Sequence, residues 1–166
     1  MQIKTVNVIG AGLAGCECAY QLAKHGIQVN LYEMKPTKFS PAHHNSNFAE
    51  LVCSNSLKSN DLTNACGLLK EELRLFDSLL IKTADKCSVP SGNALSVDRN
   101  LFASTITSTI KSCENIKIIN EAVSNIDENS ITVIATGPLT DEALATNLAK
   151  MIGEDRLYFF DAVAPI

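Results

Sequence analysis

Three glycines and one carboxylate stand at the spacing of a dinucleotide-binding site. Gly10, Gly12 and Gly15 fall in the stretch GAGLAG, and Glu33 follows 18 residues after Gly15. In such a turn the first glycine permits a tight bend, the second lets backbone amides approach a pyrophosphate, and the third lets a helix pack closely on a strand. Glu33 would accept hydrogen bonds from a ribose and repel a 2'-phosphate, so FAD or NAD suits the site better than NADP. The candidate phosphate-binding residues are Gly10, Ala11, Gly12, Leu13, Ala14 and Gly15.

A single cysteine, Cys53, stands in the polar stretch AELVCSNSLKSN, residues 49–60. Metal binding is the weakest interpretation, because His43 and His44 lie ten and nine residues upstream and no second cysteine stands at a CxxC spacing. Free cysteines are more often small buried side chains than reagents. This segment is nevertheless too polar for a core, so the residues alone leave both packing and reaction open.

The elements that must position the glycine turn form a βαβ unit. VNVIG, residues 6–10, is a short β-branched run of the kind found in a central parallel strand. Leu13 to His25 carries apolar residues at helical spacing, and Gly26 can end that helix. IQVNLYE, residues 27–33, then predicts a second strand that ends at Glu33.

The middle of the chain predicts a long polar connection and two helices. Residues 34–60 form a segment too long for an ordinary loop, and its length suggests function. A helix is expected from about Asp61 to Ile81, and a strand at residues 94–98 precedes another helix at residues 99–112 that begins at an Asp98 cap. The expected core positions are Leu69, Leu73, Phe76 and Leu80 in the first helix and Phe102, Ile106 and Ile110 in the second.

The last third of the chain predicts the return to the nucleotide sheet. NIKIINEAVSNI and SITVIATG, residues 115–126 and 130–137, favour a third strand, a small antiparallel excursion and a return strand. A helix capped by Thr140 should follow, with Leu144, Leu148 and Met151 on one face. The turn at Thr136 and Gly137 has two interpretations, an ordinary strand-to-helix turn or a second dinucleotide contact.

Composition narrows the functional classes. The 166 residues suffice for one compact core, and the net charge of -4 provides no global attraction to nucleic acid. No apolar run reaches the roughly 18 residues of a membrane span, and the first residues lead into a strand pattern, so we expect a cytoplasmic protein that does not enter a membrane. The six cysteines lack paired metal-ligand spacing and should remain thiols in a reducing compartment.

Two stretches resemble flavin-binding proteins of the glutathione-reductase type. ITVIATGP, residues 131–138, is similar to their second fingerprint, which implies that Thr136 and Gly137 approach the dinucleotide. NEAVSNI, residues 120–126, resembles the segment whose backbone contacts adenine, with Val123 at the contact position. Together with the first glycine turn, these stretches favour FAD over NAD as the bound dinucleotide.

A more specific resemblance spans the whole chain. YEMKP, PAHHNSNFAELVCSNSLKSN, LTNACGLLKEELRL, VPSGNALSVDR, IATGPLT and LYFFDAVAPI occur in the order typical of the folate- and FAD-dependent tRNA (uracil-5-)-methyltransferase family, TrmFO. The resemblance implies an α/β fold, an incomplete Rossmann-like FAD-binding domain of glutathione-reductase type. Proteins of the family are more than twice as long, so residues 1–166 are expected to be the amino-terminal part of that domain. Lys35 stands where the family usually has arginine, and Ser91 and Asn93 replace small residues.

The resemblance also implies an activity. Family members methylate C5 of the T-loop uridine of tRNA with carbon from methylenetetrahydrofolate, and reduced FAD, reloaded by NADH or NADPH, supplies electrons. Cys53 matches the first of two family cysteines, and the second has no counterpart in these residues. A different flavin oxidoreductase would leave the segment around Cys53 unexplained, and a non-catalytic nucleotide-binding domain is the other alternative. The oligomeric state does not follow from the sequence.

Overall fold

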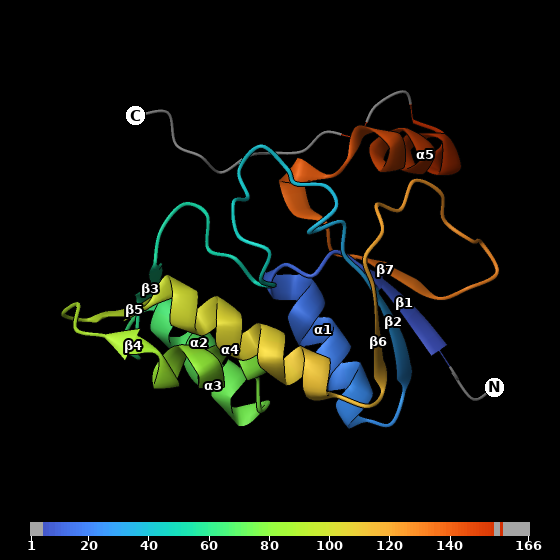
Figure 1. Ribbon diagram of the computed structural model, residues 1–166. Coiled ribbons are helices and arrows are strands. Elements are labelled where there is room, and N and C mark those ends of the chain that lie inside the picture. The colour runs from blue at the N-terminus through green and yellow to red at the C-terminus, as the bar shows by residue number, and fades with distance from the viewer. Residues whose placement is uncertain (1–4, 155–156, 158–166) are drawn as a thin grey trace.

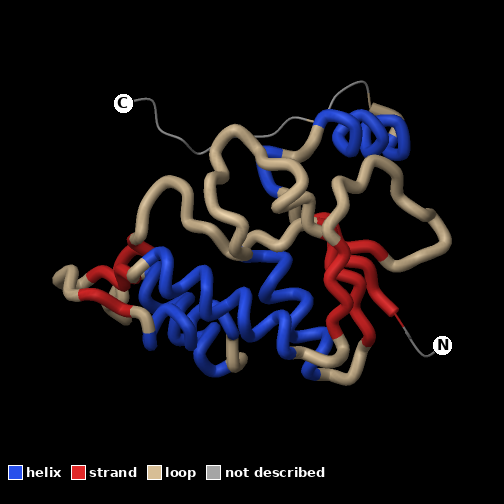
Figure 2. The backbone as a smooth tube through the Cα atoms, in the orientation of Figure 1, coloured by secondary structure: helices blue, strands red, loops and turns tan. Residues whose placement is uncertain are grey.

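The computed structural model describes residues 5–154 and residue 157, and it forms a layered α/β fold (Figure 1). The main sheet has four parallel strands in the order β6-β2-β1-β7, so that β1 is central as expected. These strands are β1 (Thr5–Ile9), β2 (Gln28–Tyr32), β6 (Ile116–Ile119) and β7 (Thr132–Ile134). The loops that follow the carboxyl ends of these strands lie at the upper end of the sheet (Figure 2).

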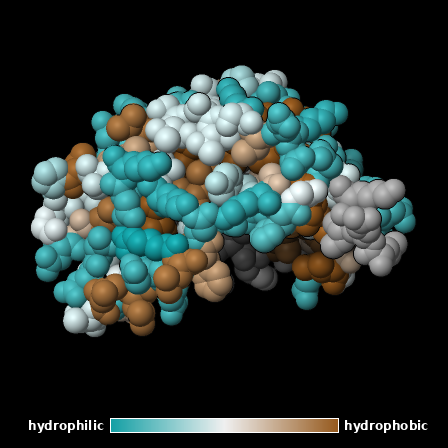
Figure 3. Space-filling view, turned by 90° about the horizontal axis from the view of Figure 1, so that it is seen from below, coloured by the Kyte–Doolittle hydropathy of each residue, from teal (hydrophilic) through white to brown (hydrophobic). Residues whose placement is uncertain are grey.

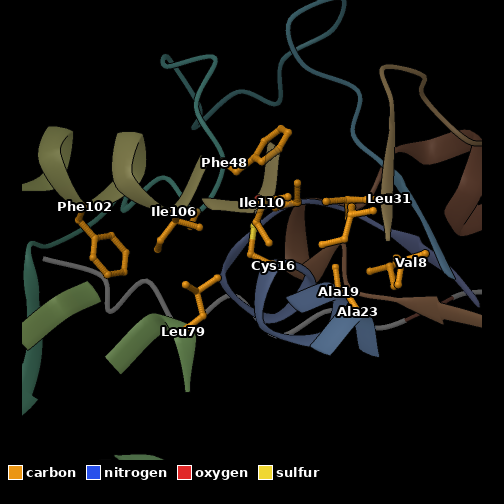
Figure 4. Close-up of a cluster of buried hydrophobic side chains, with 14 of the residues drawn as sticks. Val8, Cys16, Ala19, Ala23, Leu31, Phe48, Leu79, Phe102, Ile106 and Ile110 are labelled. Atoms are coloured by element: carbon orange, nitrogen blue, oxygen red, sulfur yellow. Dashed lines mark hydrogen bonds between the residues drawn. The ribbon is translucent and has the colours of Figure 1, made fainter. Parts of the chain in front are cut away.

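The helices are α1 (Leu13–Lys24), α2 (Ala65–Leu75), α3 (Leu79–Lys86), α4 (Arg99–Ser112) and α5 (Glu142–Ile152). Helices α1 and α4 pack on the main sheet, α3 packs on both of them, and α2 packs on α3. Side chains from β1, β2, α1, α3 and α4 meet in one cluster (Figure 4). Phe102, Ile106 and Ile110 are fully buried there, as their spacing predicts. The burial of three large side chains makes α4 a large contributor to the core.

The opposite face of the sheet is polar. The amide of Asn30 donates to the Asn7 side chain at 2.9 Å, and the Asn7 amide donates to the Ser130 hydroxyl at 3.1 Å. The antiparallel excursion expected between β6 and β7 is wrong, because residues 120–131 form no strand in the structure. These hydrogen bonds satisfy the side-chain amides of Asn30 and Asn7 on this face.

The antiparallel sheet lies instead in the middle of the chain. It consists of β3 (Ser56–Ser59), β5 (Ala94–Val97) and β4 (Ser88–Val89), in that order. The predicted strand at residues 94–98 is therefore present, but its partners were not foreseen. This small sheet lies at the opposite end of the molecule from the main sheet (Figure 1).

The long helix expected over residues 61–81 is also wrong, because it is two helices. Asp77 has a φ of 61°, in the left-handed region that ends a helix, and the Ser78 side chain caps α3 by accepting from the Ile81 N–H. Glu17 of α1 strengthens that cap by accepting hydrogen bonds from the Ser78 hydroxyl and from the N–H groups of Leu79 and Leu80. A capping signal at Ser78 thus outweighed the continuous helical pattern.

The core face assigned to α2 is wrong as well. Leu69 is 55% exposed and Phe76 is 76% exposed, whereas Lys70 is 5% exposed. Lys70 lies against the body of the protein because its ammonium donates to the carbonyls of Ser59 and Cys66. Seen from below, hydrophobic residues form separate patches on the surface (Figure 3). The expected core leucines Leu73 and Leu80 are half-buried.

Two features near the carboxyl end complete the fold. A 3-10 turn at Gly137–Leu139 precedes α5, and the α5 cap is Asp141 rather than Thr140. Thr140 instead donates to the Gly137 carbonyl at 2.7 Å. Leu144 is buried as predicted, whereas Met151 is 41% exposed.

The motif LYFFDAVAPI lies, apart from Leu157, outside the described residues. No helix of the described part of the chain is long and apolar enough to cross a membrane.

Candidate functional site

The glycine turn between β1 and α1 has backbone geometry that few other residues allow. Gly10 has a φ of 97°, and a Cβ there would lie 2.8 Å from the carbonyl oxygen of Ala135. A Cβ at Gly15 would lie 1.8 Å from the carbonyl oxygen of Gly10, whereas a Cβ at Gly12 would meet no protein atom within 4 Å. Gly10 and Gly15 are therefore required by the fold, and the space beside Gly12 is free for a ligand.

The amino-terminal end of α1 presents backbone donors to that free space. Gly12 is the N-cap residue, and no side chain of the described residues caps the helix. The first N–H groups of a helix have no partner within it, and they carry the positive end of the helix dipole. Leu13 and Ala14 belong to this first turn and contribute through their backbone. This end of α1 is suited to a phosphate group.

Glu33 stands beside the turn and is held in place by backbone donors. Its side chain is 7% exposed, and its two oxygens accept from the N–H of Ala11 at 2.8 Å and from the N–H of Lys35 at 3.0 Å. A carboxylate oxygen has two lone pairs, so each oxygen can accept a further hydrogen bond. Glu33 is therefore fixed in an orientation that suits recognition of ribose hydroxyls.

A pocket opens at the carboxyl ends of β1, β2 and β7, where ligands bind in doubly wound sheets. Six of the residues expected from the sequence line it: Gly10, Ala11, Gly12, Glu33, Val123 and Thr136. Leu13, Ala14, Gly15 and Gly137 are not in the lining: the first three begin α1 directly after the glycine turn, and Gly137 begins the 3-10 turn after β7. The pocket thus joins the first glycine turn, Glu33 and the turn after β7 in one place.

Sequence reasoning missed several lining residues that come from the long polar segment and from α5. These are Lys35, Ser40, Glu50, Asp141 and Leu144, among others. His43 also lines the pocket; the sequence had left open whether His43 and His44 position a phosphate, the folate tail or the flavin, or are solvated side chains of a polar loop. His43 Nδ1 lies 2.6 Å from the Ser40 hydroxyl, so the ring has a local partner. The exceptional length of the segment after Glu33 was the available signal, since it gives residues 34–50 enough chain to fold back over the strand ends.

An ion pair joins the polar segment to the start of α5. Lys38 donates to the Asp141 carboxylate, and this hydrogen bond lowers the pKa of Asp141 below its usual value. Asp141 also caps α5 by accepting from the Ala143 N–H. The wall of the pocket formed by α5 is therefore connected to the wall formed by the segment 34–50.

Cys53 is the exposed cysteine of the chain. Cys16 and Cys87 are buried, and Cys18, Cys66 and Cys113 are half-buried, all as free thiols. Burial, with a smaller contribution from the nearby charge of Glu33, raises the pKa of Cys16 to about 12, so that thiol is unreactive at neutral pH. Cys53 follows Glu50 by three residues and does not line the pocket. Its polar, exposed position agrees with a reactive thiol better than with a core residue.

Comparison with known proteins settles the family. Residues 5–166 match the family model described as glucose inhibited division protein A. The chain belongs to this family. It is 61% identical over its full length to the methylenetetrahydrofolate--tRNA-(uracil-5-)-methyltransferase TrmFO of Bacillus subtilis, and 60% identical over 99% of its length to the TrmFO of Acetivibrio thermocellus. The resemblance to TrmFO is thus confirmed, and the chain spans 38% of the length of each of these relatives.

A solved structure supports the fold. The chain superposes on GidA of Aquifex aeolicus with a TM-score of 0.63 and 17% sequence identity, covering 81% of this chain and 25% of that chain. At this identity the likeness concerns the fold alone. The α/β fold class expected from the sequence is confirmed.

Proposed function

We propose that the chain is the FAD-binding part of a flavin-dependent enzyme that methylates C5 of the T-loop uridine in tRNA, with methylenetetrahydrofolate as one-carbon donor and NADH or NADPH as reductant. The observation that carries the proposal is the pocket that joins Gly12, Glu33 and Thr136, in a chain about 60% identical to TrmFO proteins. By this proposal residues 1–166 form the amino-terminal part of the FAD-binding domain. Free thiols fit a reducing compartment, so the expected location is the cytoplasm.

The residues present fit a flavin dinucleotide. The open space beside Gly12 and the free N–H groups of α1 suit a pyrophosphate, and Glu33 suits the adenosine ribose. Val123 lies in the wall of the same pocket, where its backbone can meet the adenine edge, and Thr136 and Gly137 form the opposing turn. When bound, the reduced flavin supplies the electrons that turn a transferred methylene into a methyl group.

Cys53 is the residue of this chain that we assign to the reaction itself. C5 of uracil is a weak carbon nucleophile, and a thiolate that adds to C6 moves an electron pair onto the ring and makes C5 nucleophilic. A base then takes the C5 proton, the electrons of that C–H bond restore the C5–C6 double bond, and the C6–S bond breaks with its electron pair on sulfur, which frees the thiolate. This thiol has two other possible roles: it can form an adduct with a reaction intermediate, or it can transfer a proton. The target uridine must leave its base stack to reach it.

The experiment uses a protein as long as the TrmFO relatives, in which this chain forms the amino-terminal part. Purified protein, FAD, NADH or NADPH, methylenetetrahydrofolate and tRNA with an unmodified T-loop should give 5-methyluridine, measured by mass spectrometry of digested tRNA. Cys53→Ala should lower the rate by about 100-fold or more, as loss of a group acting on the reacting atoms does. Cys66→Ala, a half-buried thiol nearby in sequence, is the matched control and should retain activity. No 5-methyluridine from the parent protein, or an active Cys53→Ala, contradicts the proposal.

The 166 residues alone should not methylate tRNA. Tight binding of tRNA depends on many phosphate contacts, and a chain with a net charge of -4 offers no broad basic surface for them. Incubation of the chain with all cofactors and tRNA should leave 5-methyluridine at background. Turnover by the chain would place the whole reaction, and all essential thiols, within these residues.

A further inference from the structure

Glu50 stands between two hollows of the molecule. It lines the dinucleotide pocket together with Glu33 and Lys35, and it also lines a second hollow next to the start of α4, with His44 and Arg99. Its side chain is 14% exposed. Glu50 is therefore a mostly buried carboxylate in the wall of the pocket, three residues before Cys53.

The two carboxylate oxygens of Glu50 have different surroundings. Oε1 accepts hydrogen bonds from the N–H groups of His44 at 3.0 Å and Asn45 at 3.1 Å, so it holds the polar segment in a closed loop. Oε2 is buried, and among the described residues no donor forms a hydrogen bond with it. A buried polar atom without a partner is costly, so its presence requires an explanation such as a ligand.

The ammonium group of Lys35 does not supply the missing hydrogen bond. Its Nζ lies 3.7 Å from Glu50 Oε2, and it donates instead to the carbonyl oxygens of Asn45, at 3.1 Å, and Asn47. Lys35 is 4% exposed and is thus fixed within the segment. The ion pair balances the charge of Glu50 and leaves Oε2 with an unused acceptor position.

The same segment is joined to the glycine turn. The N–H of Ala49 donates to the carbonyl of Ala11 at 2.9 Å, while the N–H of Ala11 donates to Glu33. Ala49 is fully buried and has a φ of 50°, a conformation that needs support from its neighbours. Any ligand that occupies the pocket therefore lies against both the turn and the segment that leads to Cys53.

We propose that Glu50 is a positioning residue that links occupancy of the dinucleotide pocket to the segment carrying Cys53. This inference rests on the proposed binding of FAD. The carboxylate repels a pyrophosphate, so the group that meets Oε2 is a neutral donor, a hydroxyl of the ribose or ribityl part of the dinucleotide. With that hydroxyl bound, Oε1 and Oε2 together connect the ligand to the loop 44–50, and the thiol three residues later becomes less free to move.

The test measures FAD affinity and Cys53 reactivity separately. Glu50→Gln is the informative variant, because its amide oxygen can still accept from His44 and Asn45, while its amide nitrogen replaces Oε2 with a donor. Glu114→Gln removes an exposed carboxylate at the carboxyl end of α4 and is the matched control. Each protein is titrated with FAD, and Cys53 alkylation by iodoacetamide is followed by peptide mass spectrometry with and without saturating FAD. Melting temperatures verify that each variant is folded.

In the parent and in Glu114→Gln, FAD should slow alkylation of Cys53. Glu50→Gln should bind FAD about tenfold more weakly, as loss of one hydrogen bond to a charged group predicts, and saturating FAD should no longer slow alkylation. FAD binding with parent-like affinity in Glu50→Gln, or a preserved effect of FAD on Cys53 in that variant, overturns the inference and leaves the proposed function standing. Failure of the parent chain to bind FAD contradicts the proposed function itself.

Discussion

The glycine turn and helix α2 show opposite relations between sequence and structure. At the turn, backbone geometry decides the residue: Gly15 has no room for a Cβ, and Gly10 has a positive φ. In α2 the hydrophobic pattern predicts a buried face, yet Phe76 is 76% exposed and Lys70 is buried. A pattern that rests on steric exclusion is thus reliable, whereas an apolar stripe shows only that a helix has an apolar face, not which neighbour covers it.

The largest expected effect of a single substitution lies in the core between the two regions. Phe102→Ala should lower the free energy of unfolding by about 3–5 kcal/mol, because it removes a fully buried aromatic ring and leaves a cavity. Urea denaturation followed by circular dichroism measures this loss. A loss below about 1 kcal/mol would mean that α4 does not form the core as described.

A slightly smaller effect is expected at the turn. Gly15→Ala should cost about 3 kcal/mol, because the added Cβ meets the Gly10 carbonyl oxygen and the backbone must shift. The same denaturation experiment applies, with Gly26→Asn as control, since Gly26 has a φ of 76° but open space around it. If Gly15→Ala is as stable as the parent, steric exclusion does not determine this position.

Alkaline pH tests the burial of Cys16, a core residue of α1. Burial, with a smaller contribution from the charge of Glu33, raises the pKa of Cys16 from 9.0 to about 12, so the unfolded chain ionises this thiol first. The stabilising contribution of the neutral thiol is complete below pH 9 and is lost as pH rises from about 9 to 12. Cys16→Ser, which cannot ionise in this range, should therefore lose less stability than the parent between pH 8 and pH 10. Equal losses would show that Cys16 does not titrate differently in the two states.

The smallest effect is expected on α2. Phe76→Ser should change the free energy of unfolding of this chain by no more than about 0.5 kcal/mol, because the ring is mostly exposed. The value is measured with the same urea series as Phe102→Ala, so the two phenylalanines form a matched pair. A loss comparable with that of Phe102→Ala would show that the apolar face of α2 is buried after all.

The sequence was sufficient where a short motif determines local geometry. The βαβ unit, the Asp98 cap and the buried stripe of α4 follow from residue types alone. The break between α2 and α3 did not, since it depends on Glu17, which is 61 residues before Ser78 and helps to cap α3. The pocket residues Lys35 and Glu50 were missed for a similar reason, because a long loop gives no periodic signal for the direction of its side chains.

FAD binding at the glycine turn underlies every functional role proposed for this chain. Equilibrium titration with FAD, followed by flavin fluorescence, should show binding to the parent chain and none to Gly12→Val, whose side chain occupies the space beside α1. Without FAD the two proteins should differ in unfolding free energy by no more than about 1 kcal/mol, because Gly12 has an extended backbone and no protein atom near its Cβ position. Absence of FAD binding by the parent, or parent-like binding by Gly12→Val, would contradict the central claim that this turn binds the dinucleotide.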